Sequence, residues 1–149
     1  MACVRICVNN YKRFEMIDVT CAIIIRDNKI LATQRSEKMS LPLKWEFPGG
    51  KVENNETEED CILREIVEEL SIRIEILKKM EPQRYKYKEL TINLIPFVSN
   101  YISGEIELTE HKDYKWVALN ELNLLDWADA DILVIENFLK LDYDTTRTL

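Results

Sequence analysis

Runs of alternating or β-branched residues along the chain predict a succession of β-strands. Residues 17–25 form the clearest run, and a polar turn at residues 26–29 connects it to a returning strand at residues 30–34. Further strand patterns occur in the second half of the chain, at residues 72–77, 84–87, 90–101 and 114–118. Together they indicate a sheet, with a short turn or helix expected at residues 120–122.

Hydrophobic residues recur at helical spacing in two places. The first helix begins after Thr57, a good N-cap, and its acidic first turn suits the helix dipole. Its predicted buried stripe consists of Ile62, Leu63, Ile66, Val67 and Leu70. The second helix, residues 129–141, is predicted to face inward with Ile132, Ile135, Phe138 and Leu139. Two helices among these strands agree with an α+β or α/β fold of three packed layers.

Residues 1–15 lack a sustained period and differ in pattern from the strand that begins after them. They fit an N-terminal extension and an additional edge strand equally well. We place the main domain at residues 16–149, because the clear strand pattern starts there. No internal repeat or low-complexity segment divides this domain, and its polar tail from residue 142 onward is expected to fray.

The chain of 149 residues carries a net charge of −7 at neutral pH. A protein that binds nucleic acid stably normally has a basic face, so this charge argues against such a partner. Phosphate-containing ligands would then need metal ions or a few well-placed cations. No run approaches the ~20 apolar residues of a membrane span, and no signal peptide is evident. We therefore expect a cytoplasmic protein without a membrane partner, either a monomer or a homodimer.

The cysteines form no C-x-x-C pair and suggest no zinc site. Free thiols in a reducing compartment are the simplest interpretation of these four residues, Cys3, Cys7, Cys21 and Cys61.

Three carboxylates project together from the first helix. Glu65, Glu68 and Glu69 are spaced i, i+3 and i+4, so they share one side of the helix. Such a cluster repels itself unless cations neutralise it, and its oxygen ligands suit Mg²⁺, Mn²⁺ or Ca²⁺ rather than zinc. The alternative interpretation is a solvated acidic face, which is the usual state of an acidic run on a helix.

The residues around this cluster favour the metal site. Gly50 is followed after five residues by Glu56, and after seven more by the run from Arg64 to Ile72, R-E-I-V-E-E-L-S-I. This pattern resembles the signature of the Nudix hydrolases, G-x5-E-x7-R-E-U-x-E-E-x-G-U, where U is a bulky aliphatic residue. Ser71 alone departs from it, in place of glycine. A left-handed serine costs roughly 1 kcal/mol but removes no metal ligand.

The resemblance implies a Nudix fold, an α/β/α sandwich with a mixed sheet between helices, and a Mg²⁺ cofactor that Mn²⁺ can replace. It assigns metal binding to the Gly49 carbonyl and to Glu65, Glu68, Glu69 and Glu110, the last of these lying six residues before Trp116. Arg64 would orient a neighbouring carboxylate, while Glu65 or Glu110 would accept the proton of the attacking water. Gly50 and Glu56 would have structural roles in the loop.

The run W-E-F-P-G-G-K-V at residues 45–52 resembles the MutT-like branch, whose members hydrolyse nucleoside triphosphates to the monophosphate and pyrophosphate. Within it Arg35 is expected to contact phosphate or sugar, and Glu46 to assist near the metal. Asp131 and Asp129 are expected near the base, although Asp129 also suits a helix cap. An ionised carboxylate accepts hydrogen bonds only, which favours cytosine N4 without excluding guanine. His111, the single histidine, could act as an acid or base near pH 7, but a lone loop histidine is more often exposed, and we expect it in solvent.

The sequence most resembles CTP or dCTP pyrophosphohydrolases, with clearance of 8-oxo-dGTP as the second prediction. A Nudix hydrolase of ADP-ribose or nucleotide sugars would share every metal ligand. A non-catalytic nucleotide-binding Nudix protein is a further alternative, but the complete set of carboxylates argues against it. A plain acidic cation-binding domain would show no Mg²⁺-dependent turnover.

Overall fold

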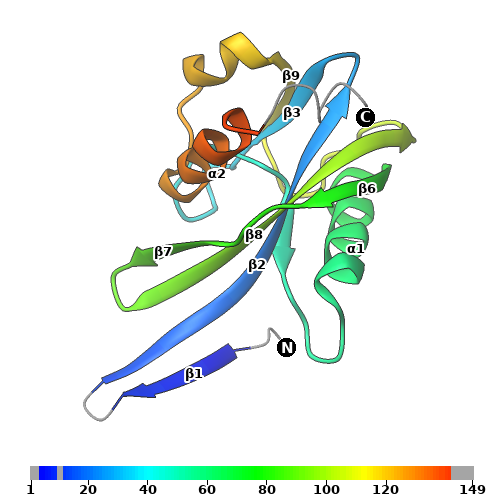
Figure 1. Cartoon of the computed structure of the whole chain (residues 1–149). Helices are drawn as coiled ribbons and strands as arrows, with labels where there is room; N and C mark the ends of the chain where they lie inside the picture. The colour runs from blue at the N-terminus through cyan, green and yellow to red at the C-terminus, as the bar shows by residue number, and fades with distance from the viewer. Residues whose placement is uncertain (1–3, 10–11, 142–149) are drawn as a thin grey trace.

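The computed structural model describes residues 4–9 and 12–141 as a mixed β-sheet with one α-helix on each face (Figure 1). The predicted α+β fold is confirmed. The strands are β1 (Val4–Asn9), β2 (Lys12–Arg26), β3 (Lys29–Gln34), β4 (Trp45–Glu46), β5 (Gly49–Lys51), β6 (Arg73–Lys79), β7 (Gln83–Tyr87), β8 (Leu90–Ser103) and β9 (Asp113–Ala118). The helices are α1 (Glu58–Leu70), the 3-10 helix η1 (Leu119–Leu124) and α2 (Asp129–Leu139).

Two long strands, β2 and β8, form the centre of the sheet. They pair in parallel from Glu15 beside Leu90 to Ile25 beside Asn100, and the strand order through them is β4-β3-β2-β8-β6. The remaining strands attach to this path, β1 and β5 on β2, β7 on β8 and β9 on β3. All of these other pairings are antiparallel.

The N-terminal residues that the structure describes belong to the sheet. Residues 4–9 form β1 and pair with the first part of β2, with Val4 opposite Ile17 and Asn9 opposite Lys12. The described part of residues 1–15 is therefore an edge strand, one of the two predicted alternatives, and β2 begins five residues before the predicted start. Residues 1–3, 10–11 and 142–149 lie outside the described residues, including Cys3 and the predicted frayed tail.

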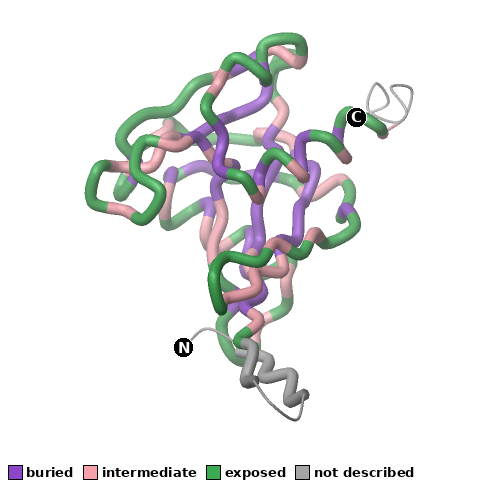
Figure 2. The backbone as a smooth tube through the Cα atoms, turned by 90° about the vertical axis from the view of Figure 1, so that its left-hand side faces the viewer, coloured by how far each residue is buried: buried purple, intermediate pink, exposed green. Residues whose placement is uncertain are grey.

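The core lies on both faces of the sheet (Figure 2). Successive side chains of β2 alternate between the faces, because a strand has a period of two. Ala22 and Ile24 pack toward α1, whereas Cys21 and Ile23 pack toward α2. Cys21 and Cys61 are buried free thiols, as predicted for them.

The buried face of α1 is narrower than its hydrophobic pattern predicted. On α1, Leu63 and Val67 are 38% and 51% exposed, because the helix contacts the sheet along a single i, i+4 stripe. This stripe consists of Ile62, Ile66 and Leu70, with Cys61 also buried. Leu63 and Val67 were therefore wrongly assigned to the core.

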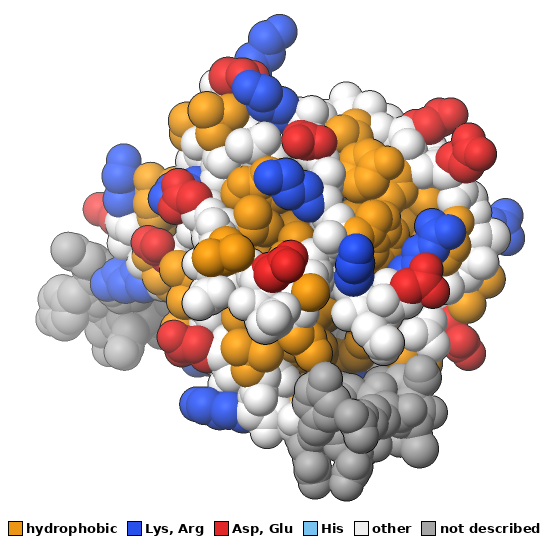
Figure 3. Space-filling view, turned by 90° about the horizontal axis from the view of Figure 1, so that it is seen from above, with side chains coloured by type: hydrophobic (Ala, Val, Ile, Leu, Met, Phe, Trp, Pro, Cys, Tyr) orange, Lys and Arg blue, Asp and Glu red, His pale blue; other side chains and the backbone are white. Residues whose placement is uncertain are grey.

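On α2 the buried face is rotated from the predicted one. Ile132 and Leu139 are 40% and 55% exposed, while Asp131 and Val134 are buried beside Ile135 and Phe138. Exposed apolar side chains also occur elsewhere, and Figure 3 shows such side chains interspersed with charged ones on the upper face. Within residues 4–9 and 12–141, neither helix has the length and apolarity needed to cross a membrane.

The ends of α1 agree with the sequence. Thr57 Oγ1 accepts a hydrogen bond from the Asp60 N–H at 3.1 Å, and Ser71 adopts the left-handed conformation with φ 58° and ψ 26°. Its N–H donates to the Val67 carbonyl, which closes the helix.

The left-handed Ser71 predicts that glycine at this position stabilises the protein. Ser71→Gly is expected to raise the free energy of unfolding by about 0.5–1 kcal/mol, because glycine adopts this conformation without steric cost. Thermal denaturation should show a rise in Tm of about 1–4 °C with unchanged turnover. Ser71→Ala keeps the β-carbon and should give no gain, and a lower Tm for Ser71→Gly would contradict the prediction.

Candidate active site

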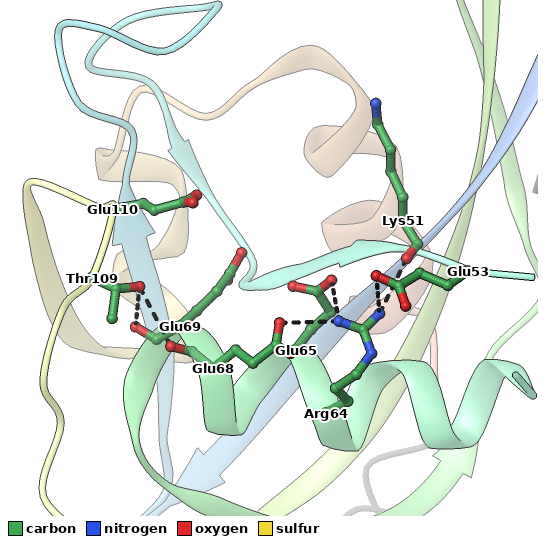
Figure 4. A pocket seen from close by; sticks show the side chains of 8 residues that line it. All are labelled: Lys51, Glu53, Arg64, Glu65, Glu68, Glu69, Thr109 and Glu110. Atoms are coloured by element: carbon green, nitrogen blue, oxygen red, sulfur yellow. Dashed lines mark hydrogen bonds and ion pairs between the residues drawn. The ribbon is translucent and has the colours of Figure 1, made fainter. Parts of the chain in front are cut away.

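The carboxylates predicted to bind metal meet in one pocket. Glu65, Glu68 and Glu69 from α1 and Glu110 from the loop before β9 line a cavity of about 490 Å³. Figure 4 shows Glu110 extending into the space above Glu69. The other lining residues are Lys51, Glu53, Arg64 and Thr109. Of these four, the sequence had pointed only to Arg64. Gly49 does not line this cavity, although its backbone N–H donates a hydrogen bond to Glu69.

Arg64 organises three of the acidic side chains. Its Nε and one terminal nitrogen donate to the two oxygens of Glu56 at 3.0 and 2.8 Å. Its other terminal nitrogen donates to Glu65 and to Glu68, both at 3.0 Å. The guanidinium lowers the pKa of Glu56 to about 2, so this carboxylate stays ionised. The arrangement gives Arg64 the orienting position expected of it.

Glu56 also organises the loop before α1. Its Oε1 accepts a hydrogen bond from the Glu53 N–H at 2.8 Å, in addition to the Arg64 pair. Glu56 does not line the carboxylate pocket. Its geometry therefore fits a structural role and not metal coordination.

Two glycines allow the loop to lie against its neighbours. A β-carbon added to Gly50 would lie 2.3 Å from Cδ of Glu65, and one added to Gly49 would lie 2.0 Å from the Thr20 carbonyl oxygen. Gly50 thus leaves the space that the Glu65 carboxylate occupies, and Gly49 allows β5 to approach β2.

Glu69 is held in an environment that disfavours its charge. Burial is the main cause that raises its pKa to about 8, and the charges of Glu65, Glu46 and Glu110 add to it. Its Oε2 is buried and has no hydrogen-bond partner among the residues that the structure describes. Burial also raises the pKa of Glu65, against the lowering effect of Arg64. A cation in the pocket would relieve both carboxylates.

These observations fit a hard divalent cation. The donors are carboxylate oxygens, one of which has no hydrogen-bond partner in the described part of the chain. The pocket also leaves room for water molecules, which Mg²⁺ retains when it binds proteins. Across the described part of the chain, no three acidic, histidine or cysteine side chains already surround a single ion position. Metal binding would therefore draw the carboxylates closer together.

A second polar cluster connects β3, β4 and the loop that carries Glu110. Arg35 donates to Glu46 Oε2 at 2.8 Å, and His111 Nε2 lies 2.9 Å from Glu46 Oε1. The expectation of an exposed His111 is wrong, because its side chain is only 2% exposed. The surroundings of the loop, which sequence spacing does not reveal, bury this ring.

Asp131 and Asp129 lie on α2 in different environments. Asp131 is 6% exposed, its Oδ1 accepts the Phe47 N–H at 2.8 Å, and burial with the nearby Glu46 raises its pKa to about 8. The assumption of an ionised Asp131 at neutral pH is therefore wrong. Asp129 is exposed and accepts a hydrogen bond from the Tyr85 hydroxyl at 2.8 Å. Ala128 occupies the N-cap, so Asp129 is not the cap.

The raised pKa values predict that the metal-free protein loses stability as pH rises. Glu69 and Asp131 titrate near pH 8 when folded and near pH 4 when unfolded. The folded state holds more protons between these values, so the free energy of unfolding falls across this window. Glu56 has the opposite effect. Its pKa is lowered in the folded state, so its contribution to the free energy of unfolding is lost only as pH falls from about 4.5 toward 2.

Tm in EDTA should therefore be highest near about pH 5 and lower at pH 8 by about 3 °C or more, which corresponds to roughly 1 kcal/mol in a domain of this size. Millimolar Mg²⁺ should recover part of the loss, and Asp131→Asn should flatten the profile. A Tm in EDTA that is equal or higher at pH 8 would contradict this expectation.

A family model described as the NUDIX domain matches residues 16–138. The chain belongs to the Nudix family. CTP pyrophosphohydrolase from Escherichia coli (strain K12) is 33% identical over 127 residues, which cover 85% of this chain and 94% of the relative. The 8-oxo-dGTP diphosphatase of Buchnera aphidicola subsp. Schizaphis graminum (strain Sg) is 32% identical over 124 residues, which cover 83% and 94%.

A solved structure supports the same Nudix assignment. The NMR structure of DNA mismatch repair protein MutT (family Nudix hydrolase) from methicillin-resistant Staphylococcus aureus 252 is 45% identical, with a TM-score of 0.69 over 85% of this chain and 98% of that chain. The predicted family and mixed-sheet fold are confirmed. This Nudix protein is a hydrolase of nucleotide phosphoanhydride bonds, and Nudix hydrolases generally need a divalent metal.

Proposed function

We propose that the protein is a Mg²⁺-dependent nucleoside triphosphate pyrophosphohydrolase that prefers CTP or dCTP and releases the monophosphate and pyrophosphate. The observation that carries this proposal is the four-carboxylate pocket, in which a buried oxygen of Glu69 has no hydrogen-bond partner within residues 4–9 and 12–141. Mn²⁺ is expected to substitute for Mg²⁺. The relative named CTP pyrophosphohydrolase supports the base preference.

The residues of the pocket have different proposed roles in the reaction. Glu65, Glu68, Glu69 and Glu110, with the Gly49 carbonyl, would hold the cation, which supplies charge neutralisation and a lowered pKa of bound water. Arg64 keeps Glu65 and Glu68 oriented. Glu110 is favoured over Glu65 as the acceptor of the water proton, because Arg64 occupies Glu65 and, within the described residues, no side chain forms a hydrogen bond or ion pair with Glu110.

The nucleoside would lie toward Arg35 and Asp131, with Asp129 at the start of the same helix. A neutral Asp131 accepts the Phe47 N–H at Oδ1, so its proton resides on Oδ2. Asp131 would then offer one donor and one acceptor to a bound base, which complements N3 and the N4 amine of cytosine. The same pair also complements O6 and N1–H of a purine. Clearance of 8-oxo-dGTP is therefore the second candidate, supported by the relative with that name.

Pyrophosphate release from ribo- and deoxynucleoside triphosphates, including 8-oxo-dGTP, tests the proposal. With Mg²⁺, CTP or dCTP should show the highest kcat/KM, and EDTA should abolish turnover. A higher kcat/KM for 8-oxo-dGTP would overturn the base preference but keep the site. If no triphosphate is cleaved, the triphosphatase assignment fails, and ADP-ribose and nucleotide sugars become the next substrates.

The neutral Asp131 predicts a pH-dependent use of CTP. As pH rises through about 8, Asp131 ionises and loses its donor to cytosine N3, so kcat/KM for CTP should fall. Asp131→Asn keeps an acceptor for the Phe47 N–H and a donor that does not titrate. It should retain the preference at pH 7 and remove this decline. Profiles from pH 6 to 9.5 measure the effect, and identical profiles for both proteins would contradict it.

A further inference from the structure

Glu46 is shared between two parts of the active centre. One carboxylate oxygen accepts from Arg35 at 2.8 Å, and the other lies 2.9 Å from Nε2 of His111. The side chains of Arg35 and Glu46 are only 17% and 18% exposed, and that of His111 is 2% exposed. The next residue, Phe47, donates its N–H to Asp131. Glu46 therefore lies between the proposed nucleoside contacts and the loop that carries Glu110.

The neighbours of Glu110 anchor its loop to three elements. The Thr109 N–H donates to the Glu69 carbonyl at the end of α1 at 3.3 Å. The Lys112 N–H donates to the Gln34 carbonyl of β3 at 2.9 Å, and the His111 ring contacts Glu46 of β4. The position of the Glu110 carboxylate in the pocket thus depends on its neighbours.

The burial of the His111 ring is unfavourable for the stability of the fold. Its Nδ1 is buried and has no hydrogen-bond partner within the described residues. Buried polar atoms are normally paired, and an unpaired one opposes folding. The contact with Glu46 uses only one ring nitrogen, which points to a positional role for this side chain.

We propose that His111 is a positioning residue that, through its hydrogen bond with Glu46, ties the placement of the Glu110 carboxylate to the Arg35–Glu46 pair. The inference rests on the proposed function, because it takes Glu110 to be part of the metal site. His111 itself does not line the carboxylate pocket. It acts indirectly, by holding Glu110, a proposed metal ligand, in place.

Two substitutions of His111 separate its hydrogen bond from its volume. Glutamine places an amide donor where Nε2 lies, whereas phenylalanine fills the space without any donor. Lys112→Ala is the matched control, because it removes only the exposed ion pair with Glu37 from the same loop. Direct Mn²⁺ titration of the nucleotide-free proteins is the readout. His111→Phe should weaken Mn²⁺ binding about tenfold, whereas His111→Gln and Lys112→Ala should remain close to wild type.

A double-mutant cycle with Glu46→Gln tests whether the effect passes through Glu46. The losses of Mn²⁺ affinity in His111→Phe and in Glu46→Gln should not add in the double mutant. The imidazole ¹⁵N spectrum of His111 should change in Glu46→Gln. Should His111→Phe fail to fold, Glu46→Gln alone still tests the inference, because it should weaken Mn²⁺ binding and change the imidazole spectrum of His111.

Wild-type Mn²⁺ affinity in His111→Phe, additive losses in the cycle, or an unchanged imidazole spectrum would each overturn the inference. The proposed function has a separate test. If wild type neither binds Mn²⁺ nor hydrolyses nucleotides, the proposed function falls together with this inference. If wild type does both and His111→Phe matches it, this inference alone falls.

Discussion

Glu69→Gln is expected to lower kcat for pyrophosphate release about a thousandfold at saturating Mg²⁺. Glu69 lines the pocket with a buried oxygen that no described residue pairs, and the amide removes a charge that a divalent ion would neutralise. A loss of roughly 4 kcal/mol in transition-state stabilisation is in keeping with what a bound ion supplies. The measurement is steady-state pyrophosphate release across a range of Mg²⁺ concentrations.

Glu59→Gln is the matched control for this experiment. It makes the same chemical change on the same helix, but Glu59 is exposed in the first turn of α1 and does not line the pocket. Its kcat should stay within about twofold of wild type, as for surface substitutions. If Glu69→Gln retains more than a tenth of wild-type kcat, Glu69 is not an essential metal ligand.

Arg64→Lys is expected to impair both folding stability and turnover, although it keeps the positive charge. The guanidinium donates to Glu56, Glu65 and Glu68 at the same time. An ammonium group cannot reproduce this planar fork. Loss of these charge-assisted bonds should lower the free energy of unfolding by about 2 kcal/mol. Misplaced carboxylates should lower kcat/KM by about ten- to hundredfold.

Thermal denaturation and steady-state kinetics measure the two losses separately. Arg73→Lys is a suitable control, since Arg73 is an exposed residue at the start of β6. If Arg64→Lys had a wild-type Tm and kcat/KM, the network would have no organising role. If Tm fell but kcat/KM at low temperature were unchanged, Arg64 would serve the fold alone.

The parts of the site that sequence predicted well are local ones. Thr57, the carboxylates of α1 and the left-handed Ser71 are all determined within a few residues by helix geometry. The spacing of Glu110 from Trp116 placed it correctly in the pocket, but only through resemblance to the family.

The features that sequence missed depend on contacts between distant segments. Glu46 and His111 are 65 residues apart, and their contact buries a histidine that was expected in solvent. Likewise, burial and the charge of Glu46, 85 residues away, raise the pKa of Asp131, and periodicity does not report either contact. Ile132 and Leu139 show a related limit, because a hydrophobic pattern does not reveal which part of a helix surface the sheet covers.

The parallel pairing of β2 with β8 has a consequence for how the chain folds. Asp18 and Asn93 lie opposite each other in this ladder although 75 residues separate them. Closing so long a loop costs entropy before any contact repays it, so folding rates fall as contacts become less local. Helix α1 needs no such closure to form its first turns. We therefore expect docking of β8 on β2 to limit the folding rate, with the acidic pocket completed only when Glu110 arrives after β8.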